Sequence, residues 1–289
     1  MNSIETNELA MGSTPTTTHE QPSELAPAEA DGYFKRLEAT LEIAEQGASE
    51  AAALIREKTA PRLAELAVSV VIPVYNERET IVEIVRRVQS VGIHQEIVIV
   101  DDYSLDGTRD LLLELDQEPD IRVVFHGYNR GKGAALRSAF TRVKGEVVIV
   151  QDADLEYDPA DFPGLLEPLQ RNMADVVYGS RFLHNADQDP SRWHRFGNWL
   201  LTRLSNFFTG LRLTDMETCY KVFRRSVLDQ ITLEQDRFGF EPEITSKLSR
   251  LGYQIHEVPI RYESRDYDQG KKIGLADAIN ALWCIVRYR

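Results

Sequence analysis

The stretch that decides the fold is GEVVIVQDADLEYDP, residues 145–159. Its first half contains Val147 to Val150, an uninterrupted β-branched run that is typical of a strand covered on both faces of a parallel sheet. Its second half holds four carboxylates, Asp152, Asp154, Glu156 and Asp158. One interpretation is that these acids only cap and turn the chain, as Asp and Asp-Pro commonly do. The other is that they surround a cation, which would remove their mutual repulsion.

Strand and helix patterns alternate on both sides of this stretch. Further strands are predicted at Val68 to Val74, 96–100 and 121–126, and helical patterns follow each of them. Short connections between such elements predict an α/β fold, with a mostly parallel, Rossmann-like central sheet and helices on both faces. Ligands of these sheets bind beyond the carboxyl ends of the strands. The polar strand ends at 75–77, 101–102 and 152–154 are therefore expected to meet at one edge.

The chain before this region is expected to form two further parts. Residues 1–31 carry six acids and no Lys or Arg, so they contribute −6 to a net charge of −13. Their composition predicts a disordered acidic leader over 1–30. Apolar residues at three- and four-residue spacing predict an accessory helix within 31–66. The sequence does not choose between packing of this helix on the core, homodimerisation through it, or both.

Composition excludes several classes of protein. The net charge of −13 argues against general binding to nucleic acid. No window approaches the roughly 18 apolar residues of a membrane span, and no secretion signal is expected. Cys219 and Cys284 show neither metal-ligand spacing nor a disulfide framework, so a reduced, cytoplasmic location is expected.

The chemistry of the acidic stretch favours a site for a metal and a diphosphate. Aspartate oxygens suit Mg²⁺ or Mn²⁺, which take one or two carboxylates and complete their coordination with ligand phosphates. The glycines of NRGKGAAL, residues 129–136, can present N–H groups to a phosphate at the start of a helix. For those glycines alone, a tight turn explains the pattern equally well.

Seven segments then occur in an order that resembles a known family. They are VVIPVYNE (70–77), VDDYSLDGT (100–108), NRGKGAALRSAF (129–140), QDADLEYDP (151–159), YGSRF (178–182), TDMETCYKVFRRSVL (214–228) and FGFEPEITSKL (238–248). Together they resemble the family 2 glycosyltransferases of GT-A fold, in the branch similar to dolichol-phosphate mannosyltransferase and other polyprenyl-phosphate glycosyltransferases. The resemblance covers residues 68–289. One departure is Tyr103 and Leu105, where the family has Gly and Thr.

The resemblance implies a domain over 67–289, with a nucleotide-sugar half at 67–180 and an acceptor half with amphipathic helices at 181–289. The nucleotide-sugar site would comprise Pro73, Tyr75, Asn76, Glu77, Asp101, Asp102, Lys132, Asp152, Ala153 and Asp154. The metal would be held by Asp152, Asp154 and Glu156. The residues expected to take part in catalysis are Asp154, Arg181, Asp215 and Glu217. The cations expected to bind the acceptor are Arg181, Arg203, Arg224 and Lys271.

These roles predict a metal-dependent, inverting enzyme that moves a hexose from a nucleotide-diphosphate sugar, of the GDP-mannose or UDP-glucose type, to polyprenyl or dolichyl phosphate. A lipid phosphate is already anionic and needs no strong base, whereas a hydroxyl acceptor would require Asp215 or Glu217 as general base. Two alternatives stay open. One is transfer to a hydroxyl in cell-envelope polysaccharide synthesis, and the other is a non-catalytic sugar-nucleotide-binding protein.

Two segments predict contact with a membrane. Residues 190–213 contain aromatic and basic residues and no acid, and the C-terminal helix is flanked by Lys271, Lys272, Arg287 and Arg289. Such surfaces suit an anionic bilayer, here expected to be the inner face of the membrane, to which the protein would bind peripherally. The alternative is that the apolar residues of 190–213 simply pack on the sheet.

Overall fold

The computed structural model describes residues 66–183, 192–264 and 275–289, without the side chains of 192–194 and 275–278. The predicted acidic leader and nearly all of the predicted accessory helix lie outside the described residues, as does Lys271.

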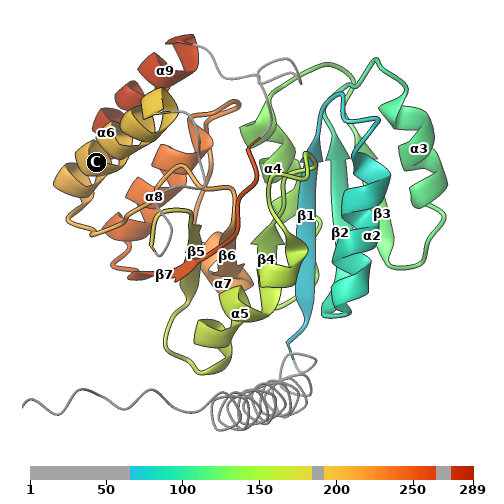
Figure 1. The fold of residues 1–289 in the computed structure, drawn as a ribbon, viewed down its shortest axis with the longest axis horizontal. Helices are drawn as coiled ribbons and strands as arrows, with labels where there is room; N and C mark the ends of the chain where they lie inside the picture. The colour runs from blue at the N-terminus through green and yellow to red at the C-terminus, as the bar shows by residue number, and fades with distance from the viewer. Residues whose placement is uncertain (1–65, 184–191, 265–274) are drawn as a thin grey trace, which may run out of the picture. The chain divides into compact units, whose positions relative to one another are not determined.

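The described residues form a seven-stranded sheet in the order β3-β2-β1-β4-β6-β5-β7 (Figure 1). The strands are β1 (Val68–Val74), β2 (His94–Asp101), β3 (Ile121–Phe125), β4 (Val147–Val150), β5 (Val176–Ser180), β6 (Lys221–Arg224) and β7 (Ile255–Pro259). All neighbouring pairs are parallel except those of β6, which runs antiparallel to β4 and β5. The predicted mostly parallel sheet is confirmed.

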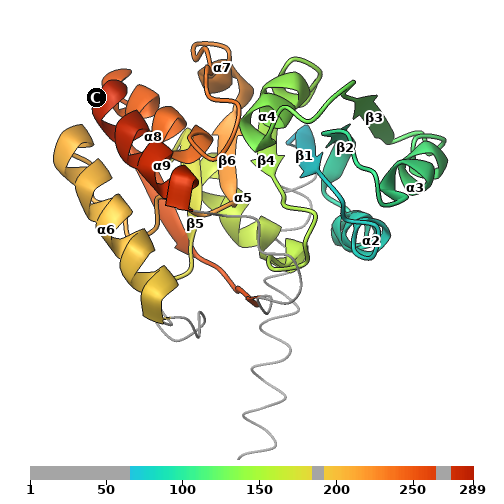
Figure 2. The same ribbon diagram turned by 90° about the horizontal axis from the view of Figure 1, so that it is seen from above.

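Helices cover both faces of this sheet. They are α2 (Ile81–Val91), α3 (Thr108–Leu115), α4 (Lys132–Phe140), α5 (Phe162–Gln170), α6 (Arg192–Thr209), α7 (Arg225–Leu228), α8 (Phe240–Arg250) and α9 (Leu275–Arg287), with a 3-10 turn η1 (Pro159–Asp161) before α5. Figure 2 shows α2 and α5 on one face and α4 and α8 on the other. Helices α6 and α9 pack against α8 and against each other.

The core confirms the interpretation of the β-branched runs. All four residues of β4 are at most 1% exposed, as are Val70, Val71 and Ile72 of β1. Helix α2 buries Ile81, Ile84, Val85 and Val88, which share one helical face. Each fully buried side chain of this size stabilises the fold by about 1.5–3 kcal/mol relative to exposure. This sheet is the rigid base on which the loops at its edge are held.

The register of the strands decides which residues share an edge. Val74 pairs with Asp101, and Val71 pairs with Val150, so the segments after β1, β2 and β4 leave the sheet at the same edge. Because β6 is antiparallel, its last residue, Arg224, pairs with Val147 at the beginning of β4. Arg224 therefore lies at the opposite edge.

Candidate active site

The loops after β1 and β2 are joined by hydrogen bonds from backbone N–H groups. The N–H of Asn76 donates to Ser104 Oγ at 2.8 Å, and that of Glu77 donates to Thr108 Oγ1 at 3.0 Å. In return, the N–H of Leu105 donates to Asn76 Oδ1 at 2.9 Å. The backbone of Asn76 is left-handed, with φ at 54°, a conformation that Asn adopts more readily than most residues. The predicted nucleotide-binding segment 73–77 thus ends in a fixed loop.

Asp101 is a fully buried carboxylate that holds the turn after β2. It accepts hydrogen bonds from the N–H groups of Tyr103 and Ser104, each at 3.2 Å, and pairs with Arg109 Nε at 3.1 Å. The Arg109 guanidinium also lies 5.6 Å from the ring centroid of Tyr103 and 5.0 Å from that of Phe125. Tyr103 has φ at 70°, so the turn accommodates its ring beside Arg109 at the cost of a sparsely populated backbone conformation.

Asp102 anchors the glycine-rich turn that precedes α4. Its carboxylate accepts hydrogen bonds from His126 Nδ1 at 2.7 Å, from the N–H of Arg130 at 2.8 Å and from the N–H of Gly131 at 2.6 Å. His126 Nε2 lies 2.9 Å from Ser138 Oγ. Sequence reasoning did not assign His126, although its place directly after β3, at the shared edge, was a signal. The place of Asp101 and Asp102 in the nucleotide-sugar site stays a prediction.

The glycines of this turn are required by close packing. Gly131 has φ at 98°, and a Cβ atom there would collide with the backbone oxygen of Asp236. A Cβ at Gly133 would collide with the backbone oxygen of Gln235. The N–H of Ala134 donates to Asp236 O at 3.0 Å. The turn therefore has a definite position against 235–236, and Lys132 begins its helix at that position.

Lys132 connects the acidic stretch to helix α8. Its Nζ lies 3.0 Å from Asp152 Oδ1 and 3.3 Å from Glu241 Oε1. Burial would lower the pKa of Lys132, but the carboxylates of Asp152 and Glu241 outweigh it and raise this pKa well above its usual value. Glu241 is only 4% exposed. Glu241 lies in the family-like segment 238–248 but is not among the predicted site residues, although an acid in the first turn of a helix was a signal.

The carboxylates of the acidic turn after β4 make different contacts. Leu155 has φ at 62°, and the N–H of Glu156 donates to Asp154 Oδ1 at 3.2 Å. Tyr262 Oη donates to Glu156 Oε2 at 3.0 Å. Asp158 accepts from the N–H of Ala160 at 2.9 Å and caps η1. Asp158 therefore turns the chain.

The carboxylates of Asp152 and Asp154 fit a divalent cation whose coordination is completed by the phosphates of the substrate. In the ranges 66–183, 192–264 and 275–289, no three His, Cys, Asp or Glu side chains form a group that could hold a metal ion. Asp152 follows β4 with its side chain 22% exposed, and Asp154 lies two residues further on. Mg²⁺ and Mn²⁺ are commonly bound by one or two carboxylates together with substrate phosphates. The residues present suit that arrangement better than a closed protein cage.

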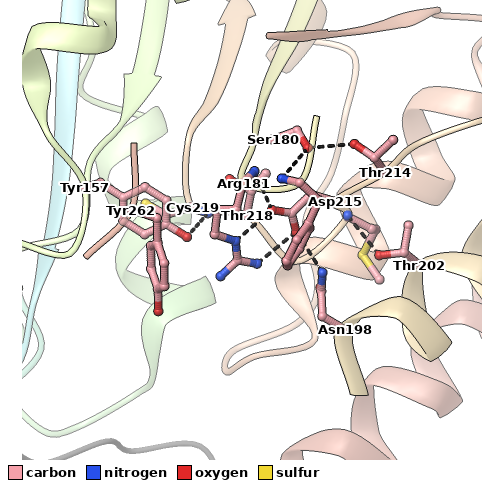
Figure 3. Close-up of polar contacts among 12 residues, drawn as sticks. Tyr157, Ser180, Arg181, Asn198, Thr202, Thr214, Asp215, Thr218, Cys219 and Tyr262 are labelled. Carbon is pink, nitrogen blue, oxygen red and sulfur yellow. Dashed lines mark hydrogen bonds and ion pairs between the residues drawn. The ribbon is translucent and has the colours of Figure 1, made fainter. Parts of the chain in front are cut away.

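A two-point ion pair joins Arg181, after β5, to Asp215 (Figure 3). Arg181 Nε lies 2.7 Å from Asp215 Oδ2, and Arg181 Nη2 lies 2.8 Å from Oδ1. Asn198 Nδ2 also donates to Oδ1, at 3.2 Å. The guanidinium lies 5.1 Å from the ring centroid of Tyr262. Asp215 is fully buried and Arg181 is 13% exposed, so this cation is held rigidly at the site edge.

Glu217 and Lys221 are two further ionisable residues that follow Asp215 along the chain. The Glu217 Oε1 atom is buried and has no hydrogen-bond partner within the described chain. Burial raises the pKa of Glu217 to about 8, helped by the charge of Glu241 and opposed by Lys221 and Arg181. Lys221 is fully buried, donates to the backbone oxygens of Met216 and Thr218, and lies 4.4 Å from the ring centroid of Tyr178. Burial lowers the pKa of Lys221.

A pocket of about 560 Å³ lies beside the Arg181–Asp215 pair. Arg203, predicted to bind the acceptor, is one of its lining residues, and so is Asn198, which contacts Asp215. The others are Phe182, Arg195, Phe196, Trp199, Thr202, Leu213 and Thr214. Arg195 was not among the predicted acceptor residues. Its position four residues before Trp199 on the acid-free segment 190–213 was the available signal.

The structure does not bring Arg224 to this site. Arg224 lies at the opposite edge of the sheet, where it pairs with Asp175 at 3.0 Å and donates to Leu169 O and Asn172 Oδ1. The antiparallel direction of β6 causes this placement, and the sequence pattern alone did not reveal that direction. The other predicted cation, Lys271, lies outside the described residues.

Comparison with known proteins gives the family and its relatives. Residues 69–232 match the model of the family described as Glycosyl transferase family 2. An Edwardsiella ictaluri protein named undecaprenyl-phosphate 4-deoxy-4-formamido-L-arabinose transferase is 33% identical over 76% of this chain and 66% of its own length. A Salmonella paratyphi B protein of the same name is 30% identical over 71% of this chain and 62% of its own length. The chain thus spans less than two thirds of each of these relatives.

Solved structures share the fold. A crystal structure of Mycobacterium tuberculosis glucosyl-3-phosphoglycerate synthase has a TM-score of 0.61 at 21% identity, over 80% of this chain and 83% of that chain. A structure of the same enzyme with Mn²⁺, UDP and phosphoglyceric acid has a TM-score of 0.62 at 19% identity, over 80% and 81%. These likenesses confirm the expected GT-A fold.

Proposed function

The chain belongs to glycosyl transferase family 2, and from this premise we propose that it transfers a hexose from a nucleotide-diphosphate sugar to a polyprenyl phosphate. The curated relatives support this acceptor class, because their name specifies transfer involving undecaprenyl phosphate. Which nucleotide sugar is used, of the GDP-mannose or UDP-glucose type, stays a prediction. The family and fold make the protein a glycosyltransferase, so a non-catalytic binding protein is the weaker interpretation.

The observation that carries this proposal is the fixed cation beside a mixed pocket. Asp215 holds Arg181 at the carboxyl end of β5, and Asn198, which donates to Asp215, also lines the pocket. The pocket combines Arg195 and Arg203 with aromatic and aliphatic side chains. An anionic phosphate attached to an apolar chain requires this combination of charge and apolar surface. We assign Arg181 to orienting the acceptor phosphate or the donor diphosphate.

On the donor side, Asp152 and Asp154 would hold Mg²⁺ or Mn²⁺. The bound cation would supply neutralisation of the negative charge that develops on the leaving diphosphate. Lys132 Nζ lies 3.0 Å from Asp152 Oδ1 and adds a second positive charge beside the proposed metal ligand. Related folds crystallised with Mn²⁺ or Mg²⁺ and UDP support a divalent cation here. Glu156 contacts Tyr262, which favours positioning of the acidic turn as its task.

The contacts of Asp215 favour a phosphate acceptor over a hydroxyl. A phosphate oxygen attacks the anomeric carbon as an anion and needs no deprotonation, whereas a hydroxyl needs a base. Asp215 accepts hydrogen bonds from Arg181 and Asn198 on both of its oxygens, so its contacts suit orientation of Arg181. Glu217, with its pKa near 8, is the remaining candidate base. Transfer to a hydroxyl through Glu217 is the second candidate function.

The surface of α6 and α9 supports association with a membrane. In the described residues, no helix is both long and apolar enough to cross a bilayer. Helix α6 nevertheless exposes Phe196, Trp199 and Phe207 by 54%, 54% and 80%, and α9 exposes Trp283 by 50%. The opposite side of α6 packs on the core through Leu201, Leu204 and Phe208. The two interpretations of 190–213 therefore describe two faces of one helix. Binding at the inner membrane face, and homodimerisation, stay predictions.

A transfer assay tests this function. The full chain would be incubated with MnCl₂, undecaprenyl phosphate in detergent and a panel of radiolabelled UDP- and GDP-hexoses, with butanol-extractable label as the readout. We expect label in the lipid fraction with one donor, and none when undecaprenyl phosphate is omitted. Sugar transfer that proceeds at the same rate without any lipid phosphate would overturn the proposed acceptor. Glu217→Gln would then test the hydroxyl alternative.

A further inference from the structure

Glu241 is a buried acid whose contacts connect it to the aspartate proposed to hold the metal. Lys132 Nζ lies 3.3 Å from Glu241 Oε1 and 3.0 Å from Asp152 Oδ1. One ammonium group therefore lies between two carboxylates, one at the end of β4 and one in the first turn of α8. Their opposite charges stabilise the arrangement only while the lysine remains between them.

The second oxygen of Glu241 has no corresponding contact. Glu241 is 4% exposed, and its Oε2 atom is buried without a hydrogen-bond partner in the described part of the chain. A buried acceptor that lacks a donor costs about 1–3 kcal/mol. Such a cost is understandable if a donor reaches the atom in another state of the site. The cation already placed at the same carboxylate is Lys132.

We infer that Glu241 is a positioning residue that takes Lys132 over from Asp152 when a divalent cation and a diphosphate occupy the donor site. This inference rests on the proposed function, in which Asp152 holds the cation. The ammonium and a divalent ion at the same carboxylate would repel each other strongly in a partly buried site. Glu241 offers the ammonium two oxygens close to its present position. Asp152 is then released, while Lys132 remains near the phosphates.

The surrounding backbone makes this a movement of one side chain. The turn before Lys132 is anchored by Asp102, which accepts from the N–H of Gly131 at 2.6 Å. The N–H of Ala134, just after it, donates to Asp236 O at 3.0 Å. Asp236 lies shortly before α8, which begins at Phe240 and carries Glu241. Lys132 and Glu241 therefore belong to segments that are held against each other, and only the flexible lysine stem has to swing.

Calorimetric titration of MnCl₂ into the full chain tests the inference, with and without UDP or GDP. Glu241→Asp keeps the negative charge, so its long-range attraction for Mn²⁺ is unchanged. The shorter side chain loses the contact with Lys132. We expect Mn²⁺ binding to weaken about tenfold, as for other residues that orient metal ligands. In a Lys132→Met background the same change should have no effect. Glu146→Asp, at an exposed residue directly before β4, is the matched control.

The outcomes separate this inference from the proposed function. If wild-type protein binds Mn²⁺ and a folded Glu241→Asp variant binds it equally well, the inference is overturned and the metal site stands. Equal weakening in both backgrounds also overturns it, because Lys132 would then play no part. If the wild type binds no Mn²⁺ with either nucleotide, the metal site itself fails. Should Glu241→Asp not fold, a crystal structure of the wild type with Mn²⁺ decides, since Lys132 must contact Glu241 Oε2 and leave Asp152.

Discussion

Arg181 and Asp215 form a two-point ion pair, with Nε–Oδ2 and Nη2–Oδ1 distances of 2.7 and 2.8 Å. Asp215 comes from the segment after α6 and Arg181 from the end of β5, so the pair connects the sheet to the pocket beside α6. This geometry uses the planar fork of the guanidinium, which an ammonium group does not reproduce. The pair therefore defines an orientation as well as a charge.

Arg181→Lys tests the importance of that orientation. We expect kcat/KM for transfer to fall about 100-fold, because a displaced charge no longer faces the reacting phosphate correctly. The positive charge is kept in this variant, so a loss of kcat/KM reports the orientation of the cation and not its presence. Steady-state kinetics against polyprenyl phosphate measure it, with circular dichroism as the control for folding. Wild-type kinetics in the variant would contradict the role assigned to Arg181.

Asp215→Ala tests the contribution of the pair to stability. Removal of the fully buried carboxylate leaves the Arg181 cation, only 13% exposed, without its partner. We expect the free energy of unfolding to fall by about 3 kcal/mol. Urea denaturation followed by tryptophan fluorescence measures this change. A loss below 1 kcal/mol, on the order of a single ordinary hydrogen bond, would show that Asp215 is not the main partner of Arg181.

Asp154→Asn tests the donor site. We expect a UDP- or GDP-sugar that raises the melting temperature of the wild type in the presence of Mn²⁺ to lose this effect in the variant. Asp158→Asn is the matched control, because Asp158 caps η1 and is not assigned to the metal. Equal stabilisation of wild type and Asp154→Asn by the nucleotide sugar and Mn²⁺ would exclude Asp154 as a ligand.

Glu217→Gln tests the pH dependence of stability. The pKa of Glu217 is raised from 4.5 to about 8. Between these values the folded protein holds a proton that the unfolded chain has released, so stability falls as the pH rises. We expect wild type and variant to melt at similar temperatures at pH 5. At pH 8.5 the variant should melt higher by at least about 2 °C, roughly the shift that 1 kcal/mol produces in a domain of this size.

Parallel thermal scans across this pH range provide the measurement. If the difference in melting temperature between wild type and Glu217→Gln is the same at pH 5 and at pH 8.5, Glu217 does not hold a proton in the folded protein. The difference would then come from the substitution itself.

Arg203→Ala and Arg224→Ala form a contrasting pair. Arg203 lines the pocket, and we expect its loss to raise the KM for polyprenyl phosphate about 10-fold, as for a charged contact worth about 1.5 kcal/mol. Arg224 lies at the opposite edge of the sheet beside Asp175, so its loss should lower stability by about 1 kcal/mol and leave KM unchanged. A raised KM in Arg224→Ala alone would reverse this assignment.

Much of the fold follows from local patterns of residues. The β-branched runs of β1, β2 and β4 predict buried parallel strands, because such continuous apolar runs are typical of a sheet that is covered on both faces. The polar residues after these strands share one edge for the same topological reason. The prediction does not extend to β6. Its sequence KVFR carries no sign of direction, and its antiparallel pairing places Lys221 near the site and Arg224 away from it.

The sequence by itself determined the buried parallel strands β1, β2 and β4, the shared edge and the acidic turn with Asp152 and Asp154, because these depend on periodicity and on residues that are close along the chain. Only the tertiary structure decided how the cations are distributed. Lys132 is held by Asp152 and Glu241, and Arg181 by Asp215, through contacts between distant segments. Charge interactions depend on distance and burial, and neither can be read from sequence spacing. The partners of the buried charges therefore emerge only when the chain is folded.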